Sequence, residues 1–364
     1  MNQSSPTEIC LTDANERHFL FNEPLNRLSG APGSSVDWSG LEAAVNLATK
    51  KQLWTVVYIS YEAANCCVGM QPMDSYGLPP WIFWQFKEAE QRPSTQRFPL
   101  CDWHGLPAEK QYQQNFNRTM DLIDSGTLYQ LNLTYRAFCD QPSSWVPFAN
   151  FDDAPNAASC IDPQLSLWST SPECFLHGSL AKKQIVTKPI KGTSVKTESS
   201  DALIGNAKET AEHVMIVDMA RNDLGRISQP GSIKVDPLLM PLTLPYAYHL
   251  ESTVSATLKT KSIAKTLQAC LPAASITGTP KVEACRQIRA IETTPRGPYT
   301  GIIGWISPEQ EFHFSLLIRT IWQDSNGRYC YGTGGGLVHD SQISSEYAEL
   351  LLKLKGATPA RSVS

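Results

Sequence analysis

Residues 128–138, LYQLNLTYRAF, alternate between apolar and polar side chains in a way that predicts a β-strand. Leu131 and Leu133 fall on one face of this strand, and Asn132 and Thr134 fall on the other. The reason is that successive side chains of a strand point to opposite sides of its sheet. Such alternation is typical of antiparallel sheets that cover a hydrophobic core with one face.

The segments around this strand mix both types of secondary structure. Further strands are predicted at residues 53–61, 81–86, 301–306, 311–320 and 329–331, and helices at 41–51, 109–125, 206–222 and 345–355. Strands and helices do not alternate regularly, so an α+β architecture with antiparallel sheet is favoured over a doubly wound fold. A polar, proline-bearing stretch at 88–106 favours a boundary between an N-terminal part, 1–105, and a second part, 106–358.

The composition is that of an ordinary globular protein. Of the 364 residues, 41% are hydrophobic and 18% are charged, and the net charge is −4, which argues against nucleic-acid and membrane-surface binding. No apolar run approaches the roughly 18 residues of a membrane span, and the N-terminus lacks a signal-peptide pattern. Ten scattered cysteines without paired CxxC spacing indicate reduced thiols. We therefore expect a cytoplasmic protein.

Two predicted helices carry pairs of carboxylates on one face. Glu209 and Glu212 are three residues apart, and Glu346 and Glu349 repeat that spacing before Lys353. Two such helices could hold Mg²⁺, which prefers oxygen ligands and often bridges to an anionic substrate. Solvated helix faces with intrahelical ion pairs fit the same pattern and are common.

One lysine lies in an unusual position. Lys191 stands between Pro189 and Gly192, just after a predicted strand, where a tight loop is expected. A lysine serves as a nucleophile only as a free amine. A surface lysine is the more frequent interpretation of such a residue.

Two further motifs could bind anions. In the run Gly332–Gly336, backbone N–H groups can approach an anion closely, although a bulge or hairpin explains the glycines equally well. The segment 275–281, SITGTPK, predicts a loop before a helix that starts near Pro280. Free N–H groups at a helix start favour anions, but simple capping by Thr279 fits too.

Three isolated residues are candidates for a site. Glu173 opens a predicted strand and by itself indicates a surface position. His249 is compatible with a core histidine or with a proton donor. Arg319 lies in the otherwise apolar segment FSLLIRTIW, where a charge needs a carboxylate partner that is either internal or bound.

Many of these segments together resemble one enzyme family. The ordered blocks between about Tyr112 and Lys355 include SGTLYQLNLTYRAF, SPECFL, PIKGT, KETAEHVMIVDMARNDLGRI, SITGTPK, FSLLIRT, GTGGGLVHDS and EYAELLLK. They are similar to the chorismate-utilising enzymes, which comprise anthranilate, aminodeoxychorismate, isochorismate and salicylate synthases. The resemblance implies an α+β fold in which large antiparallel sheets form a sandwich wrapped by helices, with residues 106–358 as the catalytic domain.

The resemblance also implies roles for individual residues. Glu212 and Glu349 would bind Mg²⁺ directly, and Glu209 and Glu346 would act through water, so that the metal holds the ring carboxylate of chorismate. Glu173 would be the general acid, and His249 the histidine of the pocket. The expected substrate-binding residues are Arg319, Tyr299, Lys353, Thr277, Gly278, Gly334, Gly335 and Gly336.

Two positions sort the activities within the family. Gln130 stands where the water-adding members carry a lysine base, so water addition is not expected. Lys191 stands where anthranilate synthase carries alanine, and this lysine marks aminodeoxychorismate synthase component I. That enzyme aminates chorismate at C4 for 4-aminobenzoate and folate synthesis through a covalent lysine adduct at C2. Its ammonia would come from a separate class I glutamine amidotransferase.

Two alternatives stay open at this stage. The first is that the chain is an anthranilate synthase component I in which Lys191 has no catalytic role. A binding or regulatory paralogue without activity is the second, although the presence of Glu173, Lys191, Glu212 and Glu349 argues against it.

Overall fold

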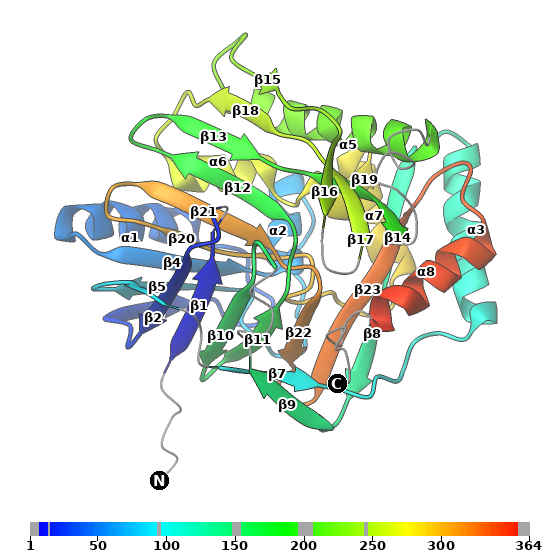
Figure 1. Cartoon of the computed structure of the whole chain (residues 1–364), viewed down its shortest axis with the longest axis horizontal. Helices are drawn as coiled ribbons and strands as arrows, with labels where there is room; N and C mark the ends of the chain where they lie inside the picture. The colour runs from blue at the N-terminus through cyan, green and yellow to red at the C-terminus, as the bar shows by residue number, and fades with distance from the viewer. Residues whose placement is uncertain are drawn as a thin grey trace.

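The fold consists of antiparallel sheets with helices packed around them (Figure 1). The computed structural model describes residues 7–13, 15–92, 96–147, 154–195, 207–243 and 247–355. Across these residues the strands form two nine-stranded sheets, one three-stranded sheet and one two-stranded sheet. The pairings between neighbouring strands are antiparallel. The predicted α+β class is therefore confirmed.

Strands distant in sequence are neighbours in both large sheets. The first large sheet contains, in spatial order, β19 (Gly278–Thr279), β8 (Gln130–Cys139), β23 (Tyr329–Leu337), β22 (Thr320–Gln323), β11 (Leu165–Ser169), β10 (Ala158–Asp162), β1 (Glu8–Thr12), β2 (His18–Asn22) and β6 (Glu90–Gln91). The second contains β15 (Lys234–Val235), β18 (Val254–Thr257), β13 (Gln184–Thr187), β12 (Cys174–Ser179), β21 (Glu311–Leu316), β20 (Ile302–Ile306), β4 (Trp54–Ile59), β5 (Trp81–Phe86) and β3 (Asn26–Ser29).

Two small sheets and the helices complete the described architecture. The small sheets are β14 (Ile190–Val195) with β17 (Ala247–Glu251) and β16 (Met240–Thr243), and β7 (Arg97–Leu100) with β9 (Ser144–Pro147). The helices are α1 (Trp38–Lys51), α2 (Tyr61–Asn65), α3 (Glu109–Asp124), α5 (Ala207–Gly225), α6 (Ile263–Cys270), α7 (Lys281–Ile291) and α8 (Ile343–Lys355), with short 3₁₀ turns η1 (Cys66–Val68) and η3 (Ala274–Ile276).

Strand β4 shows how the core is divided. Val56 and Tyr58 pack in a cluster between the two large sheets, together with side chains of β1, β2 and β10. Val57 and Ile59 point to the opposite face, into the cluster that the helices cover. Because both faces of this strand are buried, its sequence is a continuous apolar run rather than an alternating one.

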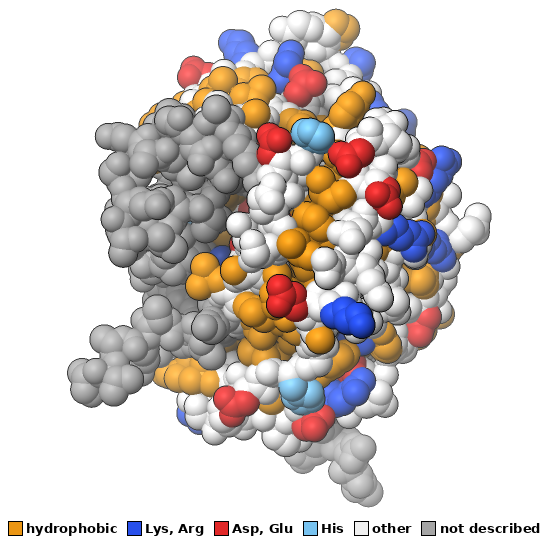
Figure 2. Space-filling model, turned by 90° about the vertical axis from the view of Figure 1, so that its right-hand side faces the viewer, with side chains coloured by type: hydrophobic (Ala, Val, Ile, Leu, Met, Phe, Trp, Pro, Cys, Tyr) orange, Lys and Arg blue, Asp and Glu red, His pale blue; other side chains and the backbone are white. Residues whose placement is uncertain are grey.

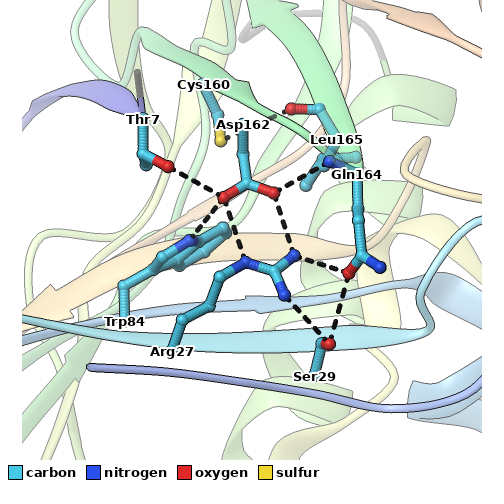
Figure 3. Close-up of polar contacts among 8 residues, drawn as sticks. All are labelled: Thr7, Arg27, Ser29, Trp84, Cys160, Asp162, Gln164 and Leu165. Atoms are coloured by element: carbon cyan, nitrogen blue, oxygen red, sulfur yellow. Dashed lines mark hydrogen bonds and ion pairs between the residues drawn. The ribbon is translucent and has the colours of Figure 1, made fainter. Parts of the chain in front are cut away.

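A buried carboxylate joins the two large sheets (Figure 3). Asp162, at the end of β10, accepts hydrogen bonds from Arg27 of β3 at 2.9 and 3.1 Å and from Trp84 Nε1 of β5 at 2.9 Å. The hydroxyl group of Thr7 and the backbone N–H of Gln164 donate to the same carboxylate. The N-terminal strands are thereby anchored to strands from the middle of the chain.

Helices α3 and α8 pack beside each other against the β8 and β23 end of the first large sheet (Figure 1). Figure 2 shows this side of the molecule, on which hydrophobic side chains lie between acidic and basic ones. Leu351 and Leu352 of α8 are among the exposed hydrophobic residues. The opposite face of α8 carries the acidic residues of the site.

The described residues contain neither a membrane-spanning helix nor a disulfide. None of the helices in the described ranges is long and apolar enough to cross a membrane. The ten cysteines are free, and Cys66 and Cys67 are the two that are not fully buried. The cysteines therefore form no disulfide framework.

Two local predictions are wrong, and one question that the sequence left open is answered. The glycine run, which was equally compatible with an anion-binding backbone and with a bulge or hairpin, lies inside strand β23, paired from Gly332 opposite Arg136 to Gly336 opposite Asn132. Lys191 lies on strand β14, opposite Leu250, instead of in a tight loop. The predicted strand through Arg319 is interrupted, because β21 ends at Leu316 and Arg319 adopts a φ of 51° before β22 begins.

Candidate active site

One cavity collects side chains from the first large sheet, the three-stranded sheet, helices α5 and α8, the turn η3 and the segments that precede β12, β20 and β22. Its volume is about 180 Å³. The predicted site residues that line it are Glu173, Lys191, Glu212, His249, Tyr299, Arg319, Gly334, Gly336, Glu346, Glu349 and Lys353. The predicted site residues, which are up to 180 positions apart in the sequence from Glu173 to Lys353, thus share one space.

Helix α8 supplies two carboxylates and a lysine. The Glu349 carboxylate pairs with Lys353 Nζ at 2.6 Å, and Lys353 also donates to the backbone carbonyl of Gly334 at 2.8 Å. Glu346 accepts a hydrogen bond of 2.7 Å from Ser341 Oγ. A Cβ atom on Gly335 would lie 3.6 Å from Glu346 Oε2 and 3.8 Å from Glu349 Oε1, so both carboxylates converge on this glycine.

The amine of Lys191 approaches strand β23 at Gly336, the residue after Gly335. A Cβ atom on Gly336 would lie only 2.7 Å from Lys191 Nζ and 2.6 Å from Gln130 Nε2. A side chain at position 336 would therefore occupy the space of the lysine amine. This close packing explains the glycine run. The missing side chains leave room for the Tyr299 ring at Gly332, for the backbone of β8 at Gly334, and for polar side chains at Gly335 and Gly336.

Glu173 is the buried acid of the cavity. It lies just before β12, where the pairing with β21 shifts register between Cys174 and Leu176, and it is 6% exposed. Burial raises the pKa of Glu173 to about 7, although the Ser275 hydroxyl and the positive charge of Lys191 oppose that rise. Near neutral pH such a carboxyl group can both donate and accept a proton.

Helix α5 is held in place by a histidine next to Glu212. His213 is fully buried, and its Nε2 lies 2.7 Å from Ser252 Oγ. Ser252 in turn accepts a hydrogen bond from the backbone N–H of Leu239. Burial lowers the pKa of His213 to about 4, so it is neutral at pH 7 and fixes the helix without adding charge. Glu212 is thereby directed to the cavity.

Three groups frame the rest of the cavity. Arg319 holds a left-handed backbone conformation that is rare outside glycine and typical of functional sites. Tyr299 is buried and packs directly against Gly332, where a Cβ atom would lie 2.1 Å from its ring. His249 is buried on β17, opposite Leu242 of β16.

Some predicted residues are not among those that line the cavity. The hydroxyl of Thr277 donates to the carbonyls of Ala273 and Ala274 at 3.0 and 3.3 Å. Gly278 permits β19 to approach β8, since a Cβ there would lie 2.2 Å from the Gln130 carbonyl oxygen. Gly335 contributes through its contact with the α8 carboxylates. The side chain of Glu209 lies outside the described residues.

Several residues of the cavity wall were assigned no role from the sequence, and two of them have polar side chains that bear on the site. Asn132 and Ser275 both line it, and Ser275 Oγ donates a hydrogen bond of 2.6 Å to Glu173 Oε1. Strand alternation put Asn132 on the polar face of β8, which was a usable signal. No local pattern could place Ser275 beside a glutamate 102 residues earlier in the chain.

Comparison with known proteins places the chain in a family. Residues 9–359 match the model of the chorismate binding enzymes. The chain therefore belongs to the chorismate binding enzyme family, as the resemblance indicated.

Relatives with two different activities match this chain. It is 35% identical over 280 residues to aminodeoxychorismate synthase component 1 of Escherichia coli (strain K12), which covers 73% of this chain and 61% of that protein. It is also 35% identical over 245 residues to an anthranilate synthase component 1 of Haloarcula marismortui, which covers 64% of this chain and 49% of that protein. The chain thus matches less than two thirds of the length of these relatives, and identity alone does not separate the two activities.

Solved structures share the fold. A crystal structure described as a 2,3-dihydroxybenzoate-specific isochorismate synthase from Bacillus anthracis has a TM-score of 0.77 to this chain. The alignment covers 97% of both chains at 16% sequence identity. Such similarity confirms the predicted sandwich of antiparallel sheets wrapped by helices.

Proposed function

We propose that this chain is an aminodeoxychorismate synthase component I, which replaces the C4 hydroxyl of chorismate by an amino group. The proposal is supported mainly by the location of Lys191, whose amine abuts Gly336 inside the cavity that Glu173 and the α8 carboxylates also line. A half-buried lysine that shares a cavity with a buried acid of pKa about 7 is suited to nucleophilic catalysis.

The first step of the proposed reaction forms a covalent adduct. The lone pair of Lys191 Nζ forms a bond to C2 of chorismate, and the two ring double bonds each shift by one position. The bond between C4 and its hydroxyl oxygen breaks, and the oxygen takes a proton from Glu173 and leaves as water. The attacking amine releases one proton, which balances the proton that Glu173 donates.

The second step reverses the first with a new nucleophile. Ammonia forms a bond to C4, the double bonds shift back, and the bond from C2 to Lys191 breaks. The proton that ammonia releases balances the one that the departing lysine amine needs. Chorismate and ammonia thus become 4-amino-4-deoxychorismate and water. Two displacements in sequence place nitrogen at C4 with retained configuration.

The carboxylate side chains of the predicted metal ligands are chemically suited to Mg²⁺. Glu212 and Glu349 would bind the ion directly, with Glu209 and Glu346 acting through water, and oxygen-only donors suit Mg²⁺. The convergence of Glu346 and Glu349 on Gly335 supports this assignment. Among the described side chains, however, no three His, Cys, Asp or Glu residues are gathered closely enough to form a complete metal site. When bound, magnesium would supply positive charge that holds the ring carboxylate of chorismate.

The positively charged groups of the cavity suit the anionic substrate. Arg319 and Lys353, with Tyr299, would position the carboxylates of chorismate. Ammonia would be supplied by a separate class I glutamine amidotransferase subunit, because that is the arrangement expected for a component I chain. The reaction would serve 4-aminobenzoate and folate synthesis in the cytoplasm.

Product analysis tests the proposal. The protein is incubated with chorismate, Mg²⁺ and ammonium, and the products are separated and identified by mass spectrometry, with and without an added aminodeoxychorismate lyase. We expect 4-amino-4-deoxychorismate, which the lyase converts to 4-aminobenzoate. Anthranilate would support the alternative that the Haloarcula relative raises, and isochorismate or unchanged chorismate would overturn the proposal.

A further inference from the structure

Ser275 contacts the buried acid directly. Its hydroxyl group donates a hydrogen bond of 2.6 Å to Glu173 Oε1. We propose that Ser275 is a positioning residue that orients the Glu173 carboxyl group and stabilises the carboxylate that remains after Glu173 has given up its proton. This inference rests on the proposed function, because it takes Glu173 as the acid of the reaction.

The turn that carries Ser275 is fixed on both sides. Ser275 is the central residue of η3, and Thr277 closes this turn with hydrogen bonds to the carbonyls of Ala273 and Ala274. Arg296 donates to the carbonyl of Ile276 at 2.8 Å and to that of Asn132 at 2.7 Å. The turn is therefore tied to strand β8, and the hydroxyl approaches Glu173 from a fixed direction.

The backbone of Glu173 is fixed as well. Its N–H donates to Ser171 Oγ at 3.2 Å, and its carbonyl accepts from the N–H of Leu316 at 3.1 Å. The side chain remains to be fixed, and the hydrogen bonds from Ser275 and from the backbone of Ile190 restrict its rotation. A restrained donor and a restrained backbone together define where the carboxyl group lies.

The hydrogen bond also decides which oxygen carries the proton. Because Oε1 already accepts the Ser275 hydrogen, this bond favours Oε2 as the oxygen that carries the transferable proton of Glu173. After transfer, the same hydroxyl donates to a charged oxygen, and such charge-assisted hydrogen bonds are stronger than neutral ones. Ser275 thus favours the ionised product of proton transfer and makes Glu173 a stronger acid.

Other charged groups also face Glu173. Lys191 of β14 and Glu251 of β17 act on it electrostatically, and the backbone of Ile190 hydrogen-bonds to it. Asp223 of α5 lies across a cavity of about 30 Å³ behind Glu173, which Ser275 also lines. The titratable or charged groups that share the main cavity with it are Glu212, His249, Tyr299, Arg319, Tyr331, Glu346, Glu349 and Lys353. Replacing Ser275 leaves all of these in place.

The direct test is a titration of Glu173. Carbon NMR of protein labelled at its glutamate carboxyl groups, with the Glu173 signal assigned by its loss in Glu173→Gln, gives the midpoint for each variant. In Ser275→Ala we expect this midpoint to rise by about one pH unit, because a hydrogen bond to a charged group is lost. Ser275→Thr keeps the hydroxyl and should restore the wild-type midpoint. An unchanged midpoint in a folded Ser275→Ala protein would overturn the inference.

Kinetics give a second readout. The ratio of variant to wild-type kcat is taken at each pH, which cancels the pH dependence of ammonia supply. For Ser275→Ala we expect kcat to fall by about 3- to 10-fold at pH 6, with a defect that shrinks above pH 7 and a KM for chorismate that stays unchanged. Ser275→Ala should add little to Glu173→Gln. A defect independent of pH, or one that persists in the Glu173→Gln background, would indicate a merely structural role.

A matched control separates this effect from general damage. Ser262 Oγ donates to Glu42 Oε2 at 2.7 Å, a similar bond between serine and glutamate at the start of α6 and outside the cavity. Ser262→Ala should leave both the Glu173 midpoint and the pH dependence of kcat unchanged, and thermal melts verify folding. The titration does not depend on which product forms, so it can fail while product analysis upholds C4 amination, and the reverse can also occur.

Discussion

Two buried carboxylates differ in the direction in which their surroundings move the pKa. Burial acts against ionisation of Asp162, but hydrogen bonds from Arg27 and Trp84 outweigh it and lower the pKa of this residue (Figure 3). Burial also acts on Glu173, and there the opposing contacts from Ser275 and Lys191 are too weak, so its pKa rises to about 7. Similar chemical groups at similar depth thus acquire different properties.

The difference lies in how many donors each carboxylate has. Both oxygens of Asp162 accept hydrogen bonds from a guanidinium group, and an indole, a hydroxyl and a backbone N–H complete the set. Such hydrogen bonds favour the ionised form of Asp162, which joins two sheets. Glu173 faces a cavity with fewer donors, so its proton stays available for chemistry. The following predictions test this contrast between an anchoring and a reactive carboxylate.

The largest effect is expected at the nucleophile that Glu173 assists. Lys191→Ala removes the amine that forms the adduct, and we expect C4 amination to fall to the background rate while chorismate still binds. Product formation and chorismate binding are measured separately. Lys182→Ala, on the exposed turn after β12, is the control that should keep full activity. Undiminished amination by Lys191→Ala would contradict covalent catalysis.

The acid itself comes next. Glu173→Gln keeps the shape of the side chain but has no proton to donate, so kcat should fall by about 10²- to 10⁴-fold. The variant should fold normally, because Glu173 forms no ion pair with any of the residues that the structure describes. Glu311→Gln, an exposed residue of β21, serves as the control. A Glu173→Gln enzyme with wild-type kcat would remove Glu173 from the mechanism.

The anchoring carboxylate should affect stability instead. Arg27→Ala leaves the charge of Asp162 buried without its main partner, and we expect the free energy of unfolding to fall by about 3–5 kcal/mol. Arg92→Ala breaks an ion pair with Glu90 whose two side chains are 44% and 51% exposed, and it should cost less than about 1 kcal/mol. Denaturant unfolding measures both. Equal losses would show that the Asp162 network contributes nothing special.

The smallest effects concern the pH dependence of stability, where the two carboxylates should differ in sign. The folded-state pKa of Asp162 is lowered, so its contribution is present above its unfolded value and is lost as pH falls. The folded-state pKa of Glu173 is raised to about 7, so its ionisation costs stability as pH rises from about 4 to 7. Asp162→Asn should therefore destabilise the protein at pH 7, and the deficit should shrink in acid.

Glu173→Gln should show the opposite behaviour. It removes a buried charge, so we expect a gain of about 3 kcal/mol at pH 8 that disappears near pH 4. Denaturant unfolding of both variants at several pH values measures these slopes. A loss of stability in Glu173→Gln at pH 8 would mean that Glu173, like Asp162, is held as a carboxylate.

Local patterns predicted the elements well where one rule dominates. Strand β5 has the bounds that the aromatic run 81–86 indicated, and α3 ends within one residue of its predicted end, just before Gly126. Helix α8 begins two residues earlier than expected. In each case the apolar periodicity and a turn residue act in the same direction, so no distant contact is needed to define the element.

Predictions were wrong where tertiary packing decides. The glycines of β23 were compatible with an anion-binding backbone and with a bulge or hairpin by local rules, but they lie in a strand, where Tyr299, Lys191 and the α8 carboxylates pack against the backbone. The break in the strand at Arg319 depends on a distant contact. The backbone carbonyl of Arg319 accepts hydrogen bonds from the backbone N–H and the hydroxyl of Thr170, 149 residues earlier in the chain. The hydrogen bond between Arg27 and Asp162 joins residues 135 positions apart, and no local pattern in either segment predicts it.

The central claim is that the amine of Lys191 attacks chorismate in the cavity shared with Glu173. It is tested most directly by incubating the protein with chorismate and Mg²⁺ in the absence of ammonium, followed by rapid acid quenching and mass spectrometry of the digested protein. The account predicts that the peptide containing Lys191 gains the mass of chorismate less one water, and that added ammonium discharges the adduct as 4-amino-4-deoxychorismate. An unmodified Lys191 in an enzyme that still aminates chorismate at C4 would contradict it.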